Sequence, residues 1–151
     1  MSSLSSDSRG VLVRCSSCGT TNRLRYATID REIRCGRCRT GLPAPASPIE
    51  SADAASFDAL ITESPVPVVV DFWAPWCAPC RMMAPELETV ARDMQGDALV
   101  VKVDTDEVSA LGERFRIRSI PTLAVFRGGR EVTRAAGVRP AAEIQALLAR
   151  A

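Results

Sequence analysis

The six cysteines constrain this chain more than any other feature, because they fall into three pairs with the spacing Cys-x-x-Cys. The first two pairs read CSSC and CGRC, and the third lies in the string WCAPC. The chain has no histidine, which excludes Cys2His2 metal sites, Cys–His dyads and Ser–His–Asp triads. Metal binding by thiolates, disulfide formation and redox exchange are the chemistries left to these pairs.

The N-terminal sequence MSSLSSDSRG lacks the basic and apolar regions of a secretion signal. No run approaches the ~18 apolar residues of a membrane helix. We therefore expect a cytoplasmic protein that has no membrane partner. Structural disulfides are rare in a reducing compartment, where Cys-x-x-Cys pairs more often bind metal or perform redox chemistry.

The first four cysteines have the spacing C-x2-C-x16-C-x2-C, which is typical of a zinc ribbon. Four thiolates would bind one structural zinc ion in a closed tetrahedral site, and metal binding would drive the folding of a segment poor in large apolar residues. Gly19 and Gly36 would let backbone amides approach the sulfurs. Reactive thiols, disulfides and an iron–sulfur cluster are the alternatives. The predicted metal ligands are Cys15, Cys18, Cys35 and Cys38.

The N-terminal part of the chain is basic, with eight arginines and three acidic residues in positions 1–46. Arginines near a four-thiolate zinc site would offset its formal charge of about −2, so they do not by themselves indicate nucleic-acid binding. Tyr26 is the only aromatic residue in this part. We therefore do not expect nucleic acid as a partner, although RNA or DNA binding by the ribbon stays an alternative.

Composition divides the chain into four parts. Residues 1–10 are rich in serine and are predicted to be disordered. Residues 11–41 would form the four-cysteine zinc-binding domain, and residues 42–48 a Pro/Ala linker. Residues 49–151 would form the larger domain.

Helical and strand patterns alternate along residues 49–151. Helices are predicted over residues 51–64, 79–95, 107–115 and 140–151. Strands are predicted over residues 67–74 and 98–104, and a hairpin over residues 122–137 with its turn at Gly128 and Gly129. This order predicts an α/β domain with a central mixed sheet flanked by helices.

The third pair follows an apolar strand and opens a helix, with Pro79 suited to the first helical turn. Cys77 would lie at the helix N-terminus, where free N–H groups and the helix dipole stabilise a thiolate. An exposed Cys77 would be the nucleophile and a more buried Cys80 the resolving thiol in thiol–disulfide exchange. No cysteine pair or histidine is left to complete a second metal site.

The strings VVVDFWAPWCAPC, IRSIPT and AAGV resemble the thioredoxin family over residues 49–151. The four-cysteine segment ahead of them resembles the thioredoxin 2 subgroup, which carries a zinc-binding extension. The resemblance implies a thioredoxin fold and a cytosolic enzyme that reduces protein disulfides. It also implies two partners, disulfide-containing client proteins and an NADPH-dependent thioredoxin reductase. The expected cofactor is one structural zinc ion, with no bound organic cofactor.

The resemblance further implies roles at the matched positions. Cys77 and Cys80 would form the redox-active disulfide, and Pro121 would be a cis-proline that faces them. Asp71 would be a buried acid with a raised pKa that exchanges a proton with Cys80, and Lys102, the only lysine, would be its partner. The substrate-binding surface would comprise Trp76, Ala78, Pro79, Ile120, Ala136 and Gly137.

The family's usual dipeptide between the cysteines is Gly-Pro, whereas this chain has Ala78-Pro79. We expect this change to affect the redox potential. Two other functions stay open from the sequence. One is a zinc-ribbon binding module or holdase with the thioredoxin fold as its scaffold. The other is a zinc-linked redox sensor, in which oxidation of the four N-terminal cysteines releases the metal.

Overall fold

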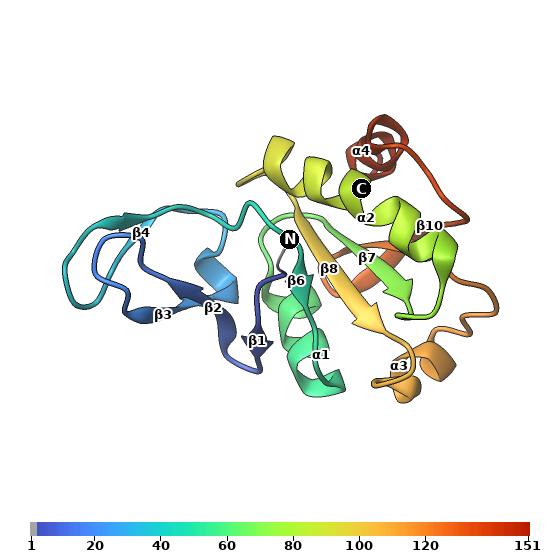
Figure 1. Cartoon of the computed structure of the whole chain (residues 1–151), viewed down its shortest axis with the longest axis horizontal. Helices are drawn as coiled ribbons and strands as arrows, with labels where there is room; N and C mark the ends of the chain where they lie inside the picture. Colours follow the sequence, from blue (N-terminus) through green and yellow to red (C-terminus); the bar gives the residue numbers. More distant parts are fainter. Residues whose placement is uncertain (1–2) are drawn as a thin grey trace.

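The computed structural model describes residues 3–151 and is built around a five-stranded mixed sheet (Figure 1). The strand order is β10-β9-β7-β8-β6, in which β6, β7 and β8 are parallel and β9 runs antiparallel to both β7 and β10. The predicted α/β class and mixed sheet are confirmed. The strands are β6 (Ile49–Glu50), β7 (Val68–Trp73), β8 (Leu99–Asp104), β9 (Thr122–Arg127) and β10 (Arg130–Ala136).

Helices cover both faces of this sheet, and each lies within a predicted range to within one residue. They are α1 (Ala54–Glu63), α2 (Ala78–Asp93), α3 (Ser109–Arg114) and α4 (Ala141–Ala149). Because side chains alternate along a strand, Val69 packs into the cluster under α2 and α4, whereas Val68 and Val70 pack into the cluster under α1 and α3. Strand β7 is therefore buried on both faces, as its apolar run predicts.

The N-terminal part forms two small antiparallel sheets that lie beside the large one (Figure 1). Their elements are β1 (Ser6–Asp7), β2 (Gly10–Arg14), β3 (Thr21–Arg25), η1 (Tyr26–Thr28), β4 (Ile33–Arg34) and β5 (Gly41–Leu42). We call residues 11–41 the ribbon and residues 49–151 the main domain.

Residues 3–10 are ordered, so the prediction of disorder over residues 1–10 is wrong for the part that the structure describes; residues 1–2 lie outside it. Leu4 donates its N–H to the Pro48 carbonyl at 2.8 Å and accepts from the Glu50 N–H at 2.8 Å. This pairing extends the large sheet beyond β6, and β1 then pairs with β2. Composition could not reveal this order, because the partners are the unpaired edge groups of a distant strand.

The ribbon and the main domain share one apolar core. Tyr26 and Ile29 of the ribbon are buried in the same cluster as Phe57 and Leu60 of α1. The predicted linker, residues 42–48, is also packed: its Ala44 is buried, and the Ala44 carbonyl accepts from the Gln95 side-chain amide at 2.7 Å. Packing thus joins segments that composition separates. No helix among residues 3–151 is long and apolar enough to cross a membrane.

Candidate redox and metal sites

Cys77 and Cys80 form a disulfide where β7 leads into α2. Cys77 is the N-cap residue of α2, and its Sγ accepts the Cys80 N–H at 3.2 Å. Pro79 lies in the first turn, where its missing N–H has no helical partner to lose. The predicted helix start is confirmed, and it directs free backbone N–H groups and the positive end of the helix dipole toward the Cys77 sulfur.

Both cysteines are buried, each with 3% of its surface exposed, so the expectation of an exposed Cys77 is wrong. Ala74, Trp73 and Ile120 pack around the pair. Cys77 Sγ lies 3.8 Å from the Ile120 carbonyl oxygen, which belongs to a loop 43 residues away along the chain. The place of Cys77 at the start of the helix could be predicted from the sequence. Its burial could not, because the loop that covers it is brought there by tertiary packing.

The Ile120–Pro121 peptide bond is cis, as predicted. The Pro121 carbonyl accepts the Gly137 N–H at 2.9 Å, which brings the exposed Ala136 and Gly137 at the end of β10 to the cis-proline loop. Gly137 has a φ of +92°, a conformation that glycine adopts without steric cost. The structure therefore groups these predicted substrate-binding residues around one loop.

Trp76 is 68% exposed beside the disulfide, and the neighbouring Ala78 and Pro79 are exposed as well. The indole N–H of Trp76 donates to Asp106 Oδ2 at 2.8 Å. Trp76 and Ile120 line a cleft of about 540 Å³, whose far wall is formed by α3 and the residues that follow it. Asp106 did not stand out in the sequence, because only the folded loop brings it to the indole.

Asp71 is 1% exposed on β7, and its Oδ1 has no hydrogen-bond partner. Burial raises the pKa of Asp71 to about 7, while Lys102 lowers that pKa and Glu50 raises it. Lys102 is directly opposite Asp71 in the β7–β8 register, and its Nζ lies 4.1 Å from the centroid of the Trp73 ring. The expected buried acid and its lysine neighbour are therefore adjacent.

The four N-terminal cysteines converge, with all four Sγ atoms within 4.8 Å of one another. Cys15 and Cys38 are 3.6 Å apart at their sulfurs, and Cys18 and Cys35 are 3.7 Å apart. A tetrahedral zinc–thiolate site with bonds of ~2.3 Å has edges of ~3.8 Å. The donor set and spacing therefore fit a four-thiolate metal ion.

Two turns of matching form present these sulfurs; we call them the knuckles, residues 15–20 and 35–40. In each, the first cysteine donates its N–H to the threonine five residues on, at 2.9 and 2.8 Å, and its carbonyl accepts the N–H of the residue before that threonine. That residue has a positive φ, +77° at Gly19 and +67° at Arg39. In the second knuckle the left-handed conformation is therefore taken by Arg39. Gly36, whose backbone freedom was expected to matter here, has no positive φ.

Polar groups around the second knuckle favour thiolates. The N–H groups of Cys38 and Arg37 and the Asn22 side-chain amide lower the pKa of Cys35 to about 6. Asn22 also accepts the Gly36 N–H at 3.0 Å, so it holds the second knuckle from both sides. The Thr40 hydroxyl and N–H lower the pKa of Cys38. Sequence reasoning missed Asn22, which carries no motif of its own.

Comparison with known proteins places most of the chain in one group. Residues 48–150 match the family model described as Thioredoxin. Thioredoxin C-3 of Corynebacterium nephridii is 36% identical over 135 residues, which is 89% of this chain and 91% of that protein. Thioredoxin 1 of a Nostoc species is 48% identical over 85 residues, 56% of this chain and 79% of its own length. A solved structure of a mutant thioredoxin from Halobacterium salinarum has a TM-score of 0.67 and 32% identity, covering 73% of this chain and 95% of its own.

Proposed function

This chain belongs to the thioredoxin family and is a protein-disulfide reductase, and on that premise we propose that it works in the cytosol through Cys77 and Cys80. The observation that carries the proposal is a disulfide at the N-terminus of α2, with a cis-proline loop against it and a buried acid on the strand that precedes it. The thioredoxin fold of the main domain, predicted from its sequence, is confirmed.

The proposed reaction moves two electrons from the reduced pair to a client disulfide. The Cys77 thiolate attacks one client sulfur, forms a mixed disulfide and releases the other client sulfur as a thiolate. The Cys80 thiol gives up its proton, and its thiolate then attacks Cys77 Sγ. This step forms the Cys77–Cys80 disulfide and releases the second client thiolate, so one client disulfide becomes two client thiols.

Asp71 is the proposed acceptor of the Cys80 proton. A carboxyl group with a pKa of about 7 is half ionised near neutral pH, where general acid–base groups are most effective. Lys102 would stabilise the ionised form across the β7–β8 register. With Cys77, Cys80, Asp71 and Lys102, we propose Pro121 as the fifth catalytic residue, because it lies in the loop whose Ile120 carbonyl faces Cys77.

Clients would bind across the surface that surrounds the disulfide, formed by Trp76, Ala78, Pro79, Ile120, Ala136 and Gly137. An extended client segment could pair with backbone groups of this surface, as in strand addition. We propose an NADPH-dependent thioredoxin reductase as the partner that reduces the disulfide again, as the family membership suggests. Ala78, in place of the family's glycine, is proposed to adjust the redox potential.

The ribbon is proposed to bind one structural zinc ion through Cys15, Cys18, Cys35 and Cys38. Zinc would cross-link the two knuckles and supply folding energy to residues 11–41. We keep residues 11–41, 42–48 and 49–151 as the proposed zinc-binding domain, linker and thioredoxin domain. Zinc content and thiol titration of the oxidised protein test this arrangement, which requires one zinc, four thiolates and one disulfide per chain.

Reduction of insulin disulfides with dithiothreitol as the electron source tests the function. We expect turnover by the wild-type protein, none by Cys77→Ser, and a trapped mixed disulfide with Cys80→Ser. Zinc content serves as the control for folding, because both variants should retain one zinc. Full activity in Cys77→Ser would contradict the assignment.

A zinc-linked redox sensor is the second candidate function, favoured by the exposure of Cys38. An oxidant can reach this sulfur, whereas Cys15 and Cys35 are buried. Oxidation of Cys38 would remove one ligand and release the metal. Peroxide treatment should then release zinc in parallel with thiol loss, and retention of zinc while Cys77 and Cys80 oxidise would count against a sensor.

A further inference from the structure

Three charged residues form a line across adjacent parallel strands of the main sheet. Glu50 on β6 is paired with Lys102 on β8, and Lys102 is paired with Asp71 on β7. We call Glu50, Lys102 and Asp71 the polar row. Directly paired residues on neighbouring strands extend from the same face of a sheet, so Lys102 stands between the two acids in the strand register.

The polar row lies on the face that α2 covers. Val69 and Val100, each two positions from a member of the row, pack into the cluster under α2 and α4, and side chains two apart on a strand share a face. Lys102 lines a small cavity of about 70 Å³ together with Ala84 and Glu88 of α2. Its other neighbour is the ring of Trp73, whose buried indole N–H has no hydrogen-bond partner. The charge of Lys102 thus acts on both acids, lowering the pKa of Asp71 and of Glu50.

The outer end of the polar row is covered by the N-terminal segment, residues 3–7. Ser3 lines the cavity at Lys102, and Ser3, Ser5 and Ser6 line a second cavity of about 380 Å³ at Glu50. The Glu50 backbone is held on both sides, because its N–H donates to Leu4 and its carbonyl accepts from the Ser6 hydroxyl at 2.8 Å. This segment therefore fixes Glu50 at the edge of the sheet.

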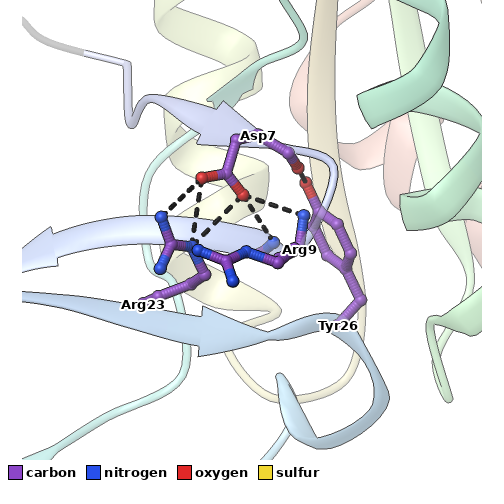
Figure 2. Close-up of polar contacts among 5 residues, drawn as sticks. Asp7, Arg9, Arg23 and Tyr26 are labelled. Carbon is purple, nitrogen blue, oxygen red and sulfur yellow. Dashed lines mark hydrogen bonds and ion pairs between the residues drawn. The ribbon is translucent and has the colours of Figure 1, made fainter.

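The same segment is anchored to the ribbon through Asp7, as Figure 2 shows. The Asp7 carboxylate accepts from the backbone N–H groups of Arg9 and Gly10 and from the Arg23 guanidinium at 2.7 Å. The Tyr26 hydroxyl donates to the Asp7 carbonyl. Residues 3–7 thus connect the ribbon to the position of Glu50.

We propose that Glu50 is a positioning residue of the reductase, which competes with Asp71 for Lys102 and so keeps Asp71 able to take up the Cys80 proton near neutral pH. The proposal rests on the proposed function, because it concerns how Asp71 acts in the resolving step. The negative charge of Glu50 offsets part of the positive charge of Lys102, so Lys102 stabilises the Asp71 carboxylate less than it would if Glu50 were neutral. Removal of the Glu50 charge therefore makes Asp71 a weaker base.

Other charges lie near the row, whereas the charges that act on the pKa of Asp71 are those of Lys102 and Glu50. Glu88 faces Lys102 from α2. Burial raises the pKa of Glu50 and Lys102 lowers it, while Asp104 and Glu107 raise it and the Trp73 side chain lowers it. On its other side, Asp71 is paired with the apolar Leu123 of β9. The two active-site cysteines do not titrate while they are joined in the disulfide, so the oxidised protein is the form in which to measure Asp71.

The test is an NMR titration of the Asp71 carboxyl group in the oxidised, full-length, metal-loaded protein. In Glu50→Gln, the Asp71 midpoint should move to lower pH by about one unit, the size expected for a charge two strands away. Glu50→Asp should restore the wild-type midpoint. Glu131→Gln, which removes the same charge from exposed β10 at the opposite edge of the sheet, should leave it unchanged.

A second measurement separates a positioning role from a structural one. In Glu50→Gln, release of the second client thiol should slow several-fold at about pH 8.5, where Asp71 is ionised in both proteins and only its basicity differs, while the first attack by Cys77 keeps its rate. Leu4→Pro, which removes the N–H bonded to Pro48, should shift the Asp71 midpoint in the same direction, because a loosened segment admits water that screens Glu50.

The outcomes are distinct. An unchanged Asp71 midpoint in Glu50→Gln overturns the proposal, even if insulin is still reduced. If Glu50→Gln shifts the Asp71 midpoint but the wild-type protein reduces no disulfide, the proposed function is overturned while the coupling of Glu50 to Asp71 stands. A midpoint that moves equally in Glu131→Gln also overturns the proposal, since it would reflect net charge alone.

Discussion

The knuckles and the active-site pair have the same Cys-x-x-Cys spacing, yet their backbones present the sulfurs differently. In each knuckle a tight turn with one positive-φ residue directs two sulfurs toward two others, 3.6 to 3.7 Å away. At Cys77 and Cys80 the backbone enters a helix of 16 residues, and the two sulfurs bond to each other. Spacing therefore permits both chemistries, and the local backbone selects between them.

The surroundings reinforce the difference. The Cys35 sulfur of the second knuckle accepts two N–H groups that stabilise its thiolate, as a metal ligand requires. The active-site pair is instead covered by Ile120 and has a buried acid on the preceding strand. The ribbon is thus suited to hold its thiolates permanently, and the main domain to exchange a bond. The four predictions below test this contrast, beginning with the largest expected effect.

Removal of the metal should have the largest effect. Chelation should lower the free energy of unfolding by on the order of 10 kcal/mol, because metal binding supplies folding energy to the ribbon. The main domain should lose stability as well, since Tyr26 and Ile29 share its core. Thermal unfolding followed by circular dichroism measures this. An unchanged melting temperature after verified zinc loss would remove the structural contrast between the two kinds of site.

Asp71→Asn should stabilise the oxidised protein at high pH. The pKa of Asp71 rises from 3.8 to about 7 on folding, so the folded protein holds a proton that the unfolded chain releases between these values. Stability is therefore lost as pH rises through this window, and the variant should gain up to about 4 kcal/mol over wild type at pH 9. Denaturant unfolding at pH 4 and pH 9 measures it.

The matched control is Asp58→Asn, at an exposed carboxylate paired with Arg114. The free energy of unfolding of this variant, relative to wild type, should not increase with pH. If Asp71→Asn is no more stable than wild type at pH 9, the buried acid is not the feature that separates the active-site pair from the knuckles.

Reduction of the Cys77–Cys80 disulfide should cost only about 2 kcal/mol of stability, because the closed loop is short. The metal should stay bound during reduction. Unfolding with and without a reductant that leaves zinc in place, with zinc content as the control, compares the two sites directly. A larger loss on reduction than on chelation would reverse the assignment of structural and exchangeable roles.

Substitution of the positive-φ residue should change the free energy of zinc binding in opposite directions in the two knuckles, by about 1 kcal/mol each. Gly19→Ala should weaken zinc binding about fivefold, whereas Arg39→Gly should strengthen it by up to a similar factor. Competition with a chelator measures both. Gly36→Ala is the control and should have little effect, because Gly36 has no positive φ and an added Cβ would make only an ordinary contact with Asn22 Oδ1 at 3.8 Å.

Much of this protein could be predicted from local patterns. The helices of the main domain, the hairpin, the four-cysteine cluster of the ribbon and the start of α2 at the third pair all follow from spacing and from short motifs. These features depend on residues close together in sequence, where propensity, periodicity and turn chemistry agree. The matched positions Asp71, Lys102 and Pro121 came from the family resemblance, and the structure brings Asp71 and Lys102 together.

The predictions that were wrong share one cause, which is that the features concerned depend on the folded structure and not on neighbouring residues in the sequence. Cys77 is covered by a loop that follows it by 43 residues, and residues 3–10 are ordered by the edge of β6. Arg39 takes the conformation expected of a glycine, because the closed knuckle requires it. None of these features leaves a local signal.

Spacing and helix position already indicate which cysteines belong together and what each pair can do chemically, because both act over a few residues. The shared core of the ribbon and the main domain, the cover of Ile120 over Cys77 and the row of Glu50, Lys102 and Asp71 are visible in the folded molecule alone. These properties depend on strand pairing and burial between distant segments, and the pKa of Asp71 follows from that burial.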